Sequence, residues 1–335
     1  MDTHAPDARA GTDAAAGRHK WLVATFVCLI TVQAAATERS RAPGVPRYGV
    51  WHAVAASELT KLLVNVAHAT WVAVRSAEGW RALVPRRGLL GSLAVRYAVP
   101  ALGYTAANAF GLFAVDAAGA TGALVAGQLK VPTTAAIWQP IMGRRMSGAH
   151  WACIFGTVTC CFVYELLRTP VTATAVVVPN LWRLYVPTVA GSVASAIAGA
   201  SNERLLKRHA EGKHVHASVH NVCLCANAGV AALVMVHASG TEPLPWSALL
   251  APPTALAVGL HAAVGLSVSA VLKELSLPHK AIAGTLAAPA SVGFARVMLG
   301  TPLPSLSRLA ALTGVAVCAS AFHLLPVPKS SQKMS

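Results

Sequence analysis

The chain has 335 residues, of which 55% are hydrophobic and only 12% are charged, and its mean hydropathy is +0.55. Soluble domains carry about 25% charged residues, so this composition excludes a soluble globular protein and indicates a polytopic membrane protein. The net charge of +15 does not indicate a nucleic-acid partner, because excess lysine and arginine in a membrane protein reports topology and contact with anionic lipid.

Charge-poor segments long enough to cross a bilayer as helices recur along the chain. We expect ten such helices, at residues 21–37, 48–74, 97–115, 117–143, 146–164, 184–202, 217–239, 249–272, 277–299 and 309–327. Ten helices divide into two sets of five, residues 20–168 and 179–327, which is the arrangement of an inverted repeat. The predicted fold class is therefore an all-α polytopic membrane protein of ten transmembrane helices in two five-helix inverted repeats.

Polar tails flank these helices, at residues 1–19 and 328–335. If the N-terminus is cytosolic, fourteen lysines and arginines of the tails and loops fall on the cytosolic side and six on the other. The positive-inside rule therefore favours this orientation. An even number of helices places the C-terminus on the same side, so we expect both termini in the cytosol.

Lys130 is the only charged residue between positions 117 and 143 and lies in the middle of the fourth predicted helix. A lysine at that depth costs about 2.5–3.5 kcal/mol on insertion scales, so it should face a polar cavity or a partner and not lipid. Asp116 lies almost four turns away, and an unpaired buried cation needs an anionic ligand or a distant partner such as Glu58. We interpret Lys130 as a ligand-binding charge inside a transporter.

Other polar residues in the predicted helices allow both a structural and a functional interpretation. Glu58 and Lys61 share one helix face, as a self-neutralising pair, as the lining of a cavity, or as both. Asn108 and Asn221 either join neighbouring helices or contact a base with their amide groups.

Lys273 and Lys280 lie seven residues apart, and Pro278 between them predicts a break in the helix. They are either a boundary pair accompanied by Glu274 or phosphate contacts. Lysines that converge without matching carboxylates indicate a phosphate or carboxylate substrate.

Nothing in the sequence indicates catalysis, a cofactor or a metal site. Walker A, G-x-S-x-G and H-E-x-x-H motifs are absent, and the seven cysteines lack zinc spacing. The histidines His209, His214, His216 and His220 have no cysteine or carboxylate support, so we interpret them as part of a solvated connection.

Several short motifs together resemble a known family. They are Glu58-Leu59-Thr60-Lys61-Leu62, Val99-Pro100-Ala101-Leu102 with Tyr104 and Asn108, Gln128-Leu129-Lys130 with Thr133-Thr134-Ala135, Gly143-Arg144 with Met146-Ser147 and Trp151, Glu203-Arg204-Leu205-Leu206-Lys207, Asn221, and the spacing of Lys273 and Lys280. These blocks are similar to the nucleotide-sugar transporters, in the branch that carries CMP-sialic acid, UDP-galactose and UDP-N-acetylglucosamine.

The resemblance implies a ten-helix fold of the drug/metabolite transporter type, which exchanges cytosolic nucleotide sugar for luminal nucleoside monophosphate across the Golgi membrane. By position, it implies that Lys130 and Lys273 hold phosphate. It also implies that Asn108 and Asn221 contact the base and that Lys61 reaches the sugar–phosphate side.

This sequence departs from the branch in the base pocket. Ala123 and Gly127 stand where the branch has tyrosines, Cys225 stands where it has a base-stacking tyrosine, and His220 replaces the arginine before Asn221. The phosphate-binding charges are therefore kept better than the base pocket.

We predict a Golgi nucleotide-sugar antiporter that works by alternating access and favours a UDP-sugar, with UDP-galactose as the first candidate. One alternative is a transporter of another phosphorylated or anionic metabolite. The other is a non-transporting membrane scaffold for glycosyltransferases. A homodimer and an association with a glycosyltransferase both stay open as partners.

Overall fold

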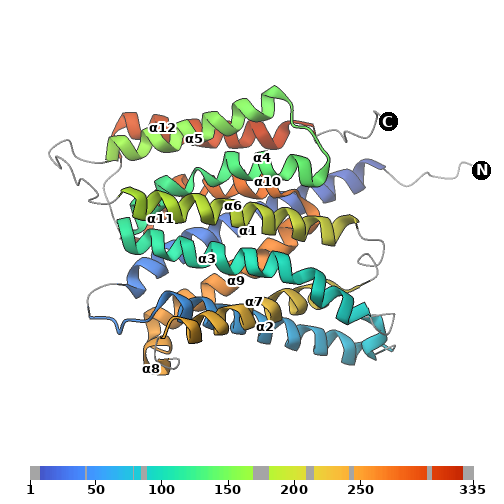
Figure 1. The fold of residues 1–335 in the computed structure, drawn as a ribbon. Coiled ribbons are helices and arrows are strands. Elements are labelled where there is room, and N and C mark those ends of the chain that lie inside the picture. Colours follow the sequence, from blue (N-terminus) through green and yellow to red (C-terminus); the bar gives the residue numbers. More distant parts are fainter. Residues whose placement is uncertain are drawn as a thin grey trace, which may run out of the picture.

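The computed structural model describes residues 8–41, 44–77, 79–83, 89–168, 181–208, 215–240, 245–299 and 304–326. The helices in this part of the chain lie side by side in a bundle, and α1 begins on the side where α12 ends (Figure 1). They are α1 (Ala8–Ser40), α2 (Val50–Arg75), the 3-10 helix η1 (Gly79–Ala82), α3 (Leu89–Gly127), α4 (Lys130–Met142), α5 (Gly148–Arg168), α6 (Leu181–Arg208), α7 (Ala217–Ala238), α8 (Trp246–Leu249), α9 (Pro252–Glu274), α10 (Leu277–Thr285), α11 (Ala287–Leu299) and α12 (Leu306–Leu324).

The ends of the chain differ from the predicted polar tails. α1 already begins at Ala8, within the segment predicted as a tail at residues 1–19. The predicted tail at 328–335 and the first two residues of the second predicted repeat, 179 and 180, lie outside the described residues.

Six helical segments of the described chain are long and apolar enough to cross a membrane: Gly17–Ser40, Leu90–Ala117, Leu184–Lys207, Ala217–Ala238, Pro252–Glu274 and Leu306–Leu324. The 26-residue α2 falls outside this group, because polar residues such as Glu58, Lys61 and Asn65 lower its hydropathy. Large apolar side chains are exposed on the bundle, among them Leu63 and Val95. Soluble monomers rarely present so much apolar surface, so the bundle is that of a multi-pass membrane protein.

The fourth predicted span is not a single helix, and the expectation of one helix over 117–143 was wrong. α3 continues to Gly127, and α4 begins at Lys130. Pro132 accounts for the boundary, because it has no N–H for the carbonyl of Gln128 and is tolerated only in the first turn of a helix. That carbonyl instead accepts from the N–H of Val131 at 3.1 Å. Lys130 therefore begins a short helix and does not lie in the middle of a long one.

The ninth predicted span, 277–299, is also divided. α10 ends at Thr285 and α11 begins at Ala287. Pro289 lacks the N–H that a continuous helix would direct at the Thr285 carbonyl, so both divided spans have a proline just after the break. The predicted break between Lys273 and Lys280 is confirmed, since α9 ends at Glu274 and α10 begins at Leu277.

Glycines allow α3 and α6 to pack closely beside the interior of the bundle. A Cβ on Gly103 of α3 would lie 2.8 Å from the Cβ of Ala198, and a Cβ on Gly191 of α6 would lie 2.9 Å from the Cβ of Phe110. Small residues at these points let membrane helices approach each other. This contact fixes the face of α3 that carries Tyr104.

A buried carboxylate fixes the start of α10. Glu203 of α6 is 1% exposed and accepts hydrogen bonds from Trp138 Nε1 at 2.8 Å, from the Leu277 N–H at 2.8 Å and from Lys207 Nζ at 3.0 Å. A carboxylate is favourable at a helix N-terminus. Glu203 thereby joins α4, α6 and α10, and this arrangement positions Lys280 in the first turns of α10.

Candidate functional site

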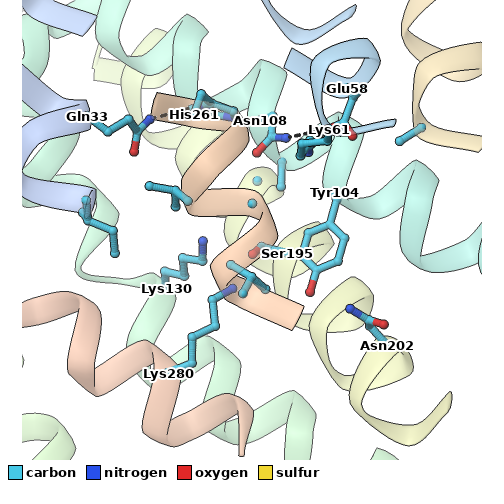
Figure 2. A pocket seen from close by; sticks show the side chains of 18 of the residues that line it. Gln33, Glu58, Lys61, Tyr104, Asn108, Lys130, Ser195, Asn202, His261 and Lys280 are labelled. Atoms are coloured by element: carbon cyan, nitrogen blue, oxygen red, sulfur yellow. Dashed lines mark hydrogen bonds and ion pairs between the residues drawn. The ribbon is translucent and has the colours of Figure 1, made fainter. Parts of the chain in front are cut away.

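A cavity of about 380 Å³ lies in the interior of the bundle. Helices α1, α2, α3, α4, α6, α7, α9 and α10 contribute to its wall. The polar residues that Figure 2 labels around it are Gln33, Glu58, Lys61, Tyr104, Asn108, Lys130, Ser195, Asn202, His261 and Lys280. Ligand pockets commonly measure about 300–1,000 Å³ and carry a few convergent polar groups, so this cavity is the candidate binding site.

One end of the cavity is cationic. Lys130 from α4 and Lys280 from α10 both line it and are close enough to interact electrostatically. The Lys280 ammonium lies over the ring of Tyr104, 5.8 Å from the ring centroid. In the part of the chain that the structure describes, neither lysine has a carboxylate within ion-pair distance. Two uncompensated cations in a partly enclosed site favour an anionic ligand.

A compensated ion pair lies at the other end, which Figure 2 shows well separated from Lys130 and Lys280. Lys61 Nζ is 2.5 Å from Glu58 Oε1, and both residues are buried. Asn108 Nδ2 is 3.4 Å from the same carboxylate oxygen. The predicted contact between Glu58 and Lys61 is confirmed, and because both also line the cavity, the two readings of the pair hold together.

The Lys61 side chain lies along α9, where a glycine leaves room for it. A Cβ on Gly265 would be only 2.7 Å from Lys61 Cδ and 3.1 Å from Lys61 Nζ. Gly265 also lines the cavity. The absence of a side chain at this position therefore sets where the Lys61 ammonium lies.

Gln33 of α1 and His261 of α9 extend this polar end. Gln33 Nε2 is 3.0 Å from His261 Nδ1, and His261 interacts electrostatically with Lys61. Because an amide nitrogen can only donate, His261 accepts at Nδ1 and carries its proton on Nε2. Two groups of contacts therefore lie at this end, Gln33 with His261 and Lys61 with Glu58 and Asn108, and His261 feels the charge of Lys61.

Beside Lys280, the cavity wall holds the Tyr104 hydroxyl and the Asn202 side chain. The two groups are close enough for a poorly aligned hydrogen bond to each other, and neither Tyr104 Oη nor Asn202 Nδ2 has a partner in good hydrogen-bond geometry among the described residues. The adjacent Glu203 carboxylate is already engaged by its three donors.

The structure brings six of the seven candidate site residues to the cavity: Lys130, Lys280, Lys61, Glu58, Asn108 and Asn221. It does not bring Lys273 there. Lys273 lies in the last turn of α9 and is exposed, because the break before α10 separates it from Lys280. The phosphate role implied for Lys273 therefore does not fit its position, and Lys280 is the lysine that accompanies Lys130.

Two positions at which the sequence departs from the resembled branch, Gly127 and Cys225, also line the cavity. His220 lies in α7 and is hydrogen-bonded through Nδ1 to the Tyr97 hydroxyl at 2.8 Å, so it belongs to the packed helix and not to the preceding connection. The side chain of Ala123 lies outside the described residues.

Sequence reasoning missed Gln33, His261, Tyr104 and Asn202 as cavity residues. A signal was available for Gln33 and His261, because polar residues inside apolar helices often mark functional positions. Tyr104 and Asn202 could not be placed in this way, since only the packing of α3 against α6 brings them to one wall.

Comparisons with known proteins agree with this architecture. The family model described as "Nucleotide-sugar transporter" matches residues 20–322. One solved structure, described as "Crystal structure of protein", has a similar fold, with a TM-score of 0.60, 18% sequence identity, and coverage of 92% of this chain and 98% of that chain. The comparison with curated proteins finds no match. Because the family match spans most of the sequence, the chain belongs to the nucleotide-sugar transporter family and is a transporter, not an enzyme.

Proposed function

We propose that this protein is a Golgi antiporter that imports a nucleotide sugar in exchange for a nucleoside monophosphate. The observation that carries the proposal is the pair of uncompensated lysines, Lys130 and Lys280, in one central cavity. Lysine acts as a point charge toward phosphate, and both the imported and the exported substrate carry a phosphate group. One cationic site can therefore bind both substrates in turn, as exchange by alternating access requires.

The packing of the helices supports a bundle of ten membrane spans in two inverted repeats. If α10 and α11 together count as one span and α8 as none, α2 packs against α7, α4 against α10, and α5 against α12. Each of these pairs joins a span to its counterpart five spans later. The other extensive pairs exchange with one another under the same relation: α1–α9 with α3–α6, α3–α7 with α2–α9, and α4–α6 with the packing of α1 against α10 and α11. A two-fold relation between repeats, with a site at their interface, suits alternating access.

The proposed orientation in the membrane and the proposed substrate rest mainly on the sequence. The excess of basic loop residues favours cytosolic termini, and α1 begins on the side where α12 ends (Figure 1). The choice of a UDP-sugar, with UDP-galactose first, follows from the branch that the motifs resemble. The departures at Gly127 and Cys225 make the base the first property to measure.

The test is uptake of labelled nucleotide sugars into proteoliposomes preloaded with UMP, CMP, GMP or AMP. Stimulation of uptake by one internal monophosphate would support antiport and identify the base. Uptake of a different phosphorylated metabolite would favour the other-anion transporter. If folded protein, confirmed by its melting transition, took up neither nucleotide sugars nor other phosphorylated metabolites, the proposal would be contradicted and the scaffold would be favoured.

A further inference from the structure

Gln33 and His261 form a hydrogen-bonded pair on the cavity wall. Recognition of phosphate by Lys130 and Lys280 gives this pair no role. Gln33 and His261 come from α1 and α9, which are adjacent in the bundle, and their side chains meet at 3.0 Å on the cavity wall. Neither is fully buried, so the cavity has access to both. Figure 2 shows them at the end occupied by Asn108, Lys61 and Glu58, away from Lys130 and Lys280.

This pair leaves unused hydrogen-bonding groups of both kinds. Gln33 uses one Nε2–H toward His261, which leaves its second N–H as a donor and Oε1 as an acceptor. His261 accepts at Nδ1, so its Nε2–H is a donor. Hydroxyl groups both donate and accept, so donors and acceptors placed side by side suit a polyhydroxyl group.

The charge at this end suits a neutral group as well. The Glu58 carboxylate offsets the Lys61 ammonium at 2.5 Å, so the region has no net charge from this pair. The excess positive charge of the cavity lies at Lys130 and Lys280. A substrate with a charged phosphate and an uncharged hydroxyl-rich part would thus place the phosphate at the lysines and the uncharged part at Gln33 and His261.

A nucleobase fits this end less well than a sugar. Besides the His261 imidazole, the aromatic residues among the described cavity lining are Phe26 and Tyr104. Phe26 packs with Val271 and Ala283, and Tyr104 faces the Lys280 ammonium. Neither ring is in a described contact with Gln33 or His261, so this pair offers hydrogen-bonding groups and not a phenyl or phenol surface for stacking.

We propose that Gln33 and His261 bind hydroxyl groups of the sugar and set which sugar the protein accepts. The inference rests on the proposed function, because it requires a nucleotide sugar as substrate. It assigns to this pair a role in selecting the sugar, separate from the phosphate recognition assigned to the lysines.

The test compares two ligands that differ only by the sugar part. Affinities for a nucleotide sugar and for the sugar-free nucleotide are measured on purified protein, using UDP-galactose, UDP-N-acetylglucosamine and UDP, then CMP-sialic acid and CMP. In Gln33→Leu and in His261→Phe, the affinity for the nucleotide sugar should fall about tenfold, as expected for one or two lost hydrogen bonds. The affinity for the sugar-free nucleotide, UDP or CMP, should change less than about twofold. His261→Gln, which keeps a donor and an acceptor, should restore most of the sugar preference.

The matched control is Asn227→Leu. Asn227 Nδ2 donates to the Ala94 carbonyl at 2.9 Å and so also joins two helices, but Asn227 is not part of the described cavity lining. If the loss of an interhelical hydrogen bond alone caused the change, Asn227→Leu would also change the ratio of the affinity for the nucleotide sugar to that for the sugar-free nucleotide. That result would overturn the inference.

The remaining outcomes separate the inference from the proposed function. Wild-type protein that binds no member of the panel, and no nucleotide sugar with a guanine or adenine base, would overturn the proposed function and the inference with it. Wild-type protein that binds both ligands, with an unchanged affinity ratio in Gln33→Leu and His261→Phe, would overturn the inference alone. Equal losses for the nucleotide sugar and the sugar-free nucleotide would place the nucleotide part at this end, which also contradicts the inference.

Discussion

Lys130 and Lys280 extend into one cavity from α4 and α10, helices that belong to different halves of the chain (Figure 2). Each of these helices begins just after a break and has a proline in its first turn. The two ammonium groups repel each other, and no described carboxylate forms an ion pair with either. An anion bound between them relieves this repulsion, so the cavity should bind phosphate-bearing ligands better than uncharged ones.

Lys280→Ala should weaken the binding of nucleoside monophosphates by about ten- to hundredfold, since a hydrogen bond to a charged group contributes about 1.5–3 kcal/mol. The affinity for the corresponding nucleoside, which has no phosphate, should stay within about twofold. Equilibrium binding to detergent-purified protein measures both. Lys273→Ala is the matched control, because Lys273 is exposed at the end of α9, and it should bind like the wild type. Equal losses in the two variants would contradict the placement of the phosphate at Lys280.

Glu58→Gln should destabilise the protein, because it leaves the buried Lys61 ammonium without its 2.5 Å partner. Removal of one partner of a buried ion pair typically costs about 3–5 kcal/mol, which a lowered melting temperature in detergent would report. Glu58→Gln combined with Lys61→Met removes both charges and should recover most of that stability without recovering transport. If the double variant transported normally, the pair would have a structural role alone.

Gly265→Ala tests the position of the Lys61 ammonium. The new methyl group would lie 2.7 Å from Lys61 Cδ, and the flexible lysine side chain can move away at little cost to folding. We therefore expect a nearly unchanged melting temperature, because the ammonium can shift while it keeps its ion pair with Glu58, but a reduced rate of exchange, because its position in the cavity changes. Gly259→Ala, on the same helix with no atom within 4 Å of the added Cβ, should leave exchange intact. A wild-type rate in Gly265→Ala would show that this position of Lys61 is not needed.

Glu203→Gln should destabilise the start of α10. The amide cannot provide the charge that attracts Lys207, and it replaces one carboxylate oxygen by a donor facing the Trp138 and Leu277 N–H groups or Lys207. Loss of such charge-assisted bonds costs about 2 kcal/mol. Hydrogen exchange at the Leu277 amide should therefore accelerate, and the melting temperature should fall. Unchanged protection at Leu277 would show that α10 is held in place by other contacts.

The membrane class, the family and the contact between Glu58 and Lys61 could be predicted from the sequence, because composition, motif spacing and helix periodicity are local properties. The interruption at Gly127–Lys130 could have been predicted from Pro132, but the apolar run on both sides suggested one continuous helix. The sequence predicted the break between Lys273 and Lys280, but it could not show which of the two faces the cavity, because that depends on how α9 and α10 pack in the bundle.

The contribution of Gln33 and His261 required the tertiary structure. The two residues lie far apart in the sequence and come together only because α1 packs along α9. The same holds for Tyr104 and Asn202, which reach one wall through the close packing of α3 and α6. Sequence patterns identified residues that are unusual within their own helix, and they could not identify the residues that meet across helices.

The most direct test of the central claim is exchange by Lys130→Ala in proteoliposomes preloaded with the monophosphate that stimulates the wild type. We expect the variant to fold, because removal of a cation from a membrane-embedded site relieves an insertion cost, and we expect exchange to be abolished. Lys130→Arg should fail as well, since a planar guanidinium does not replace a compact ammonium in a confined site. Exchange at the wild-type rate by Lys130→Ala would contradict the account.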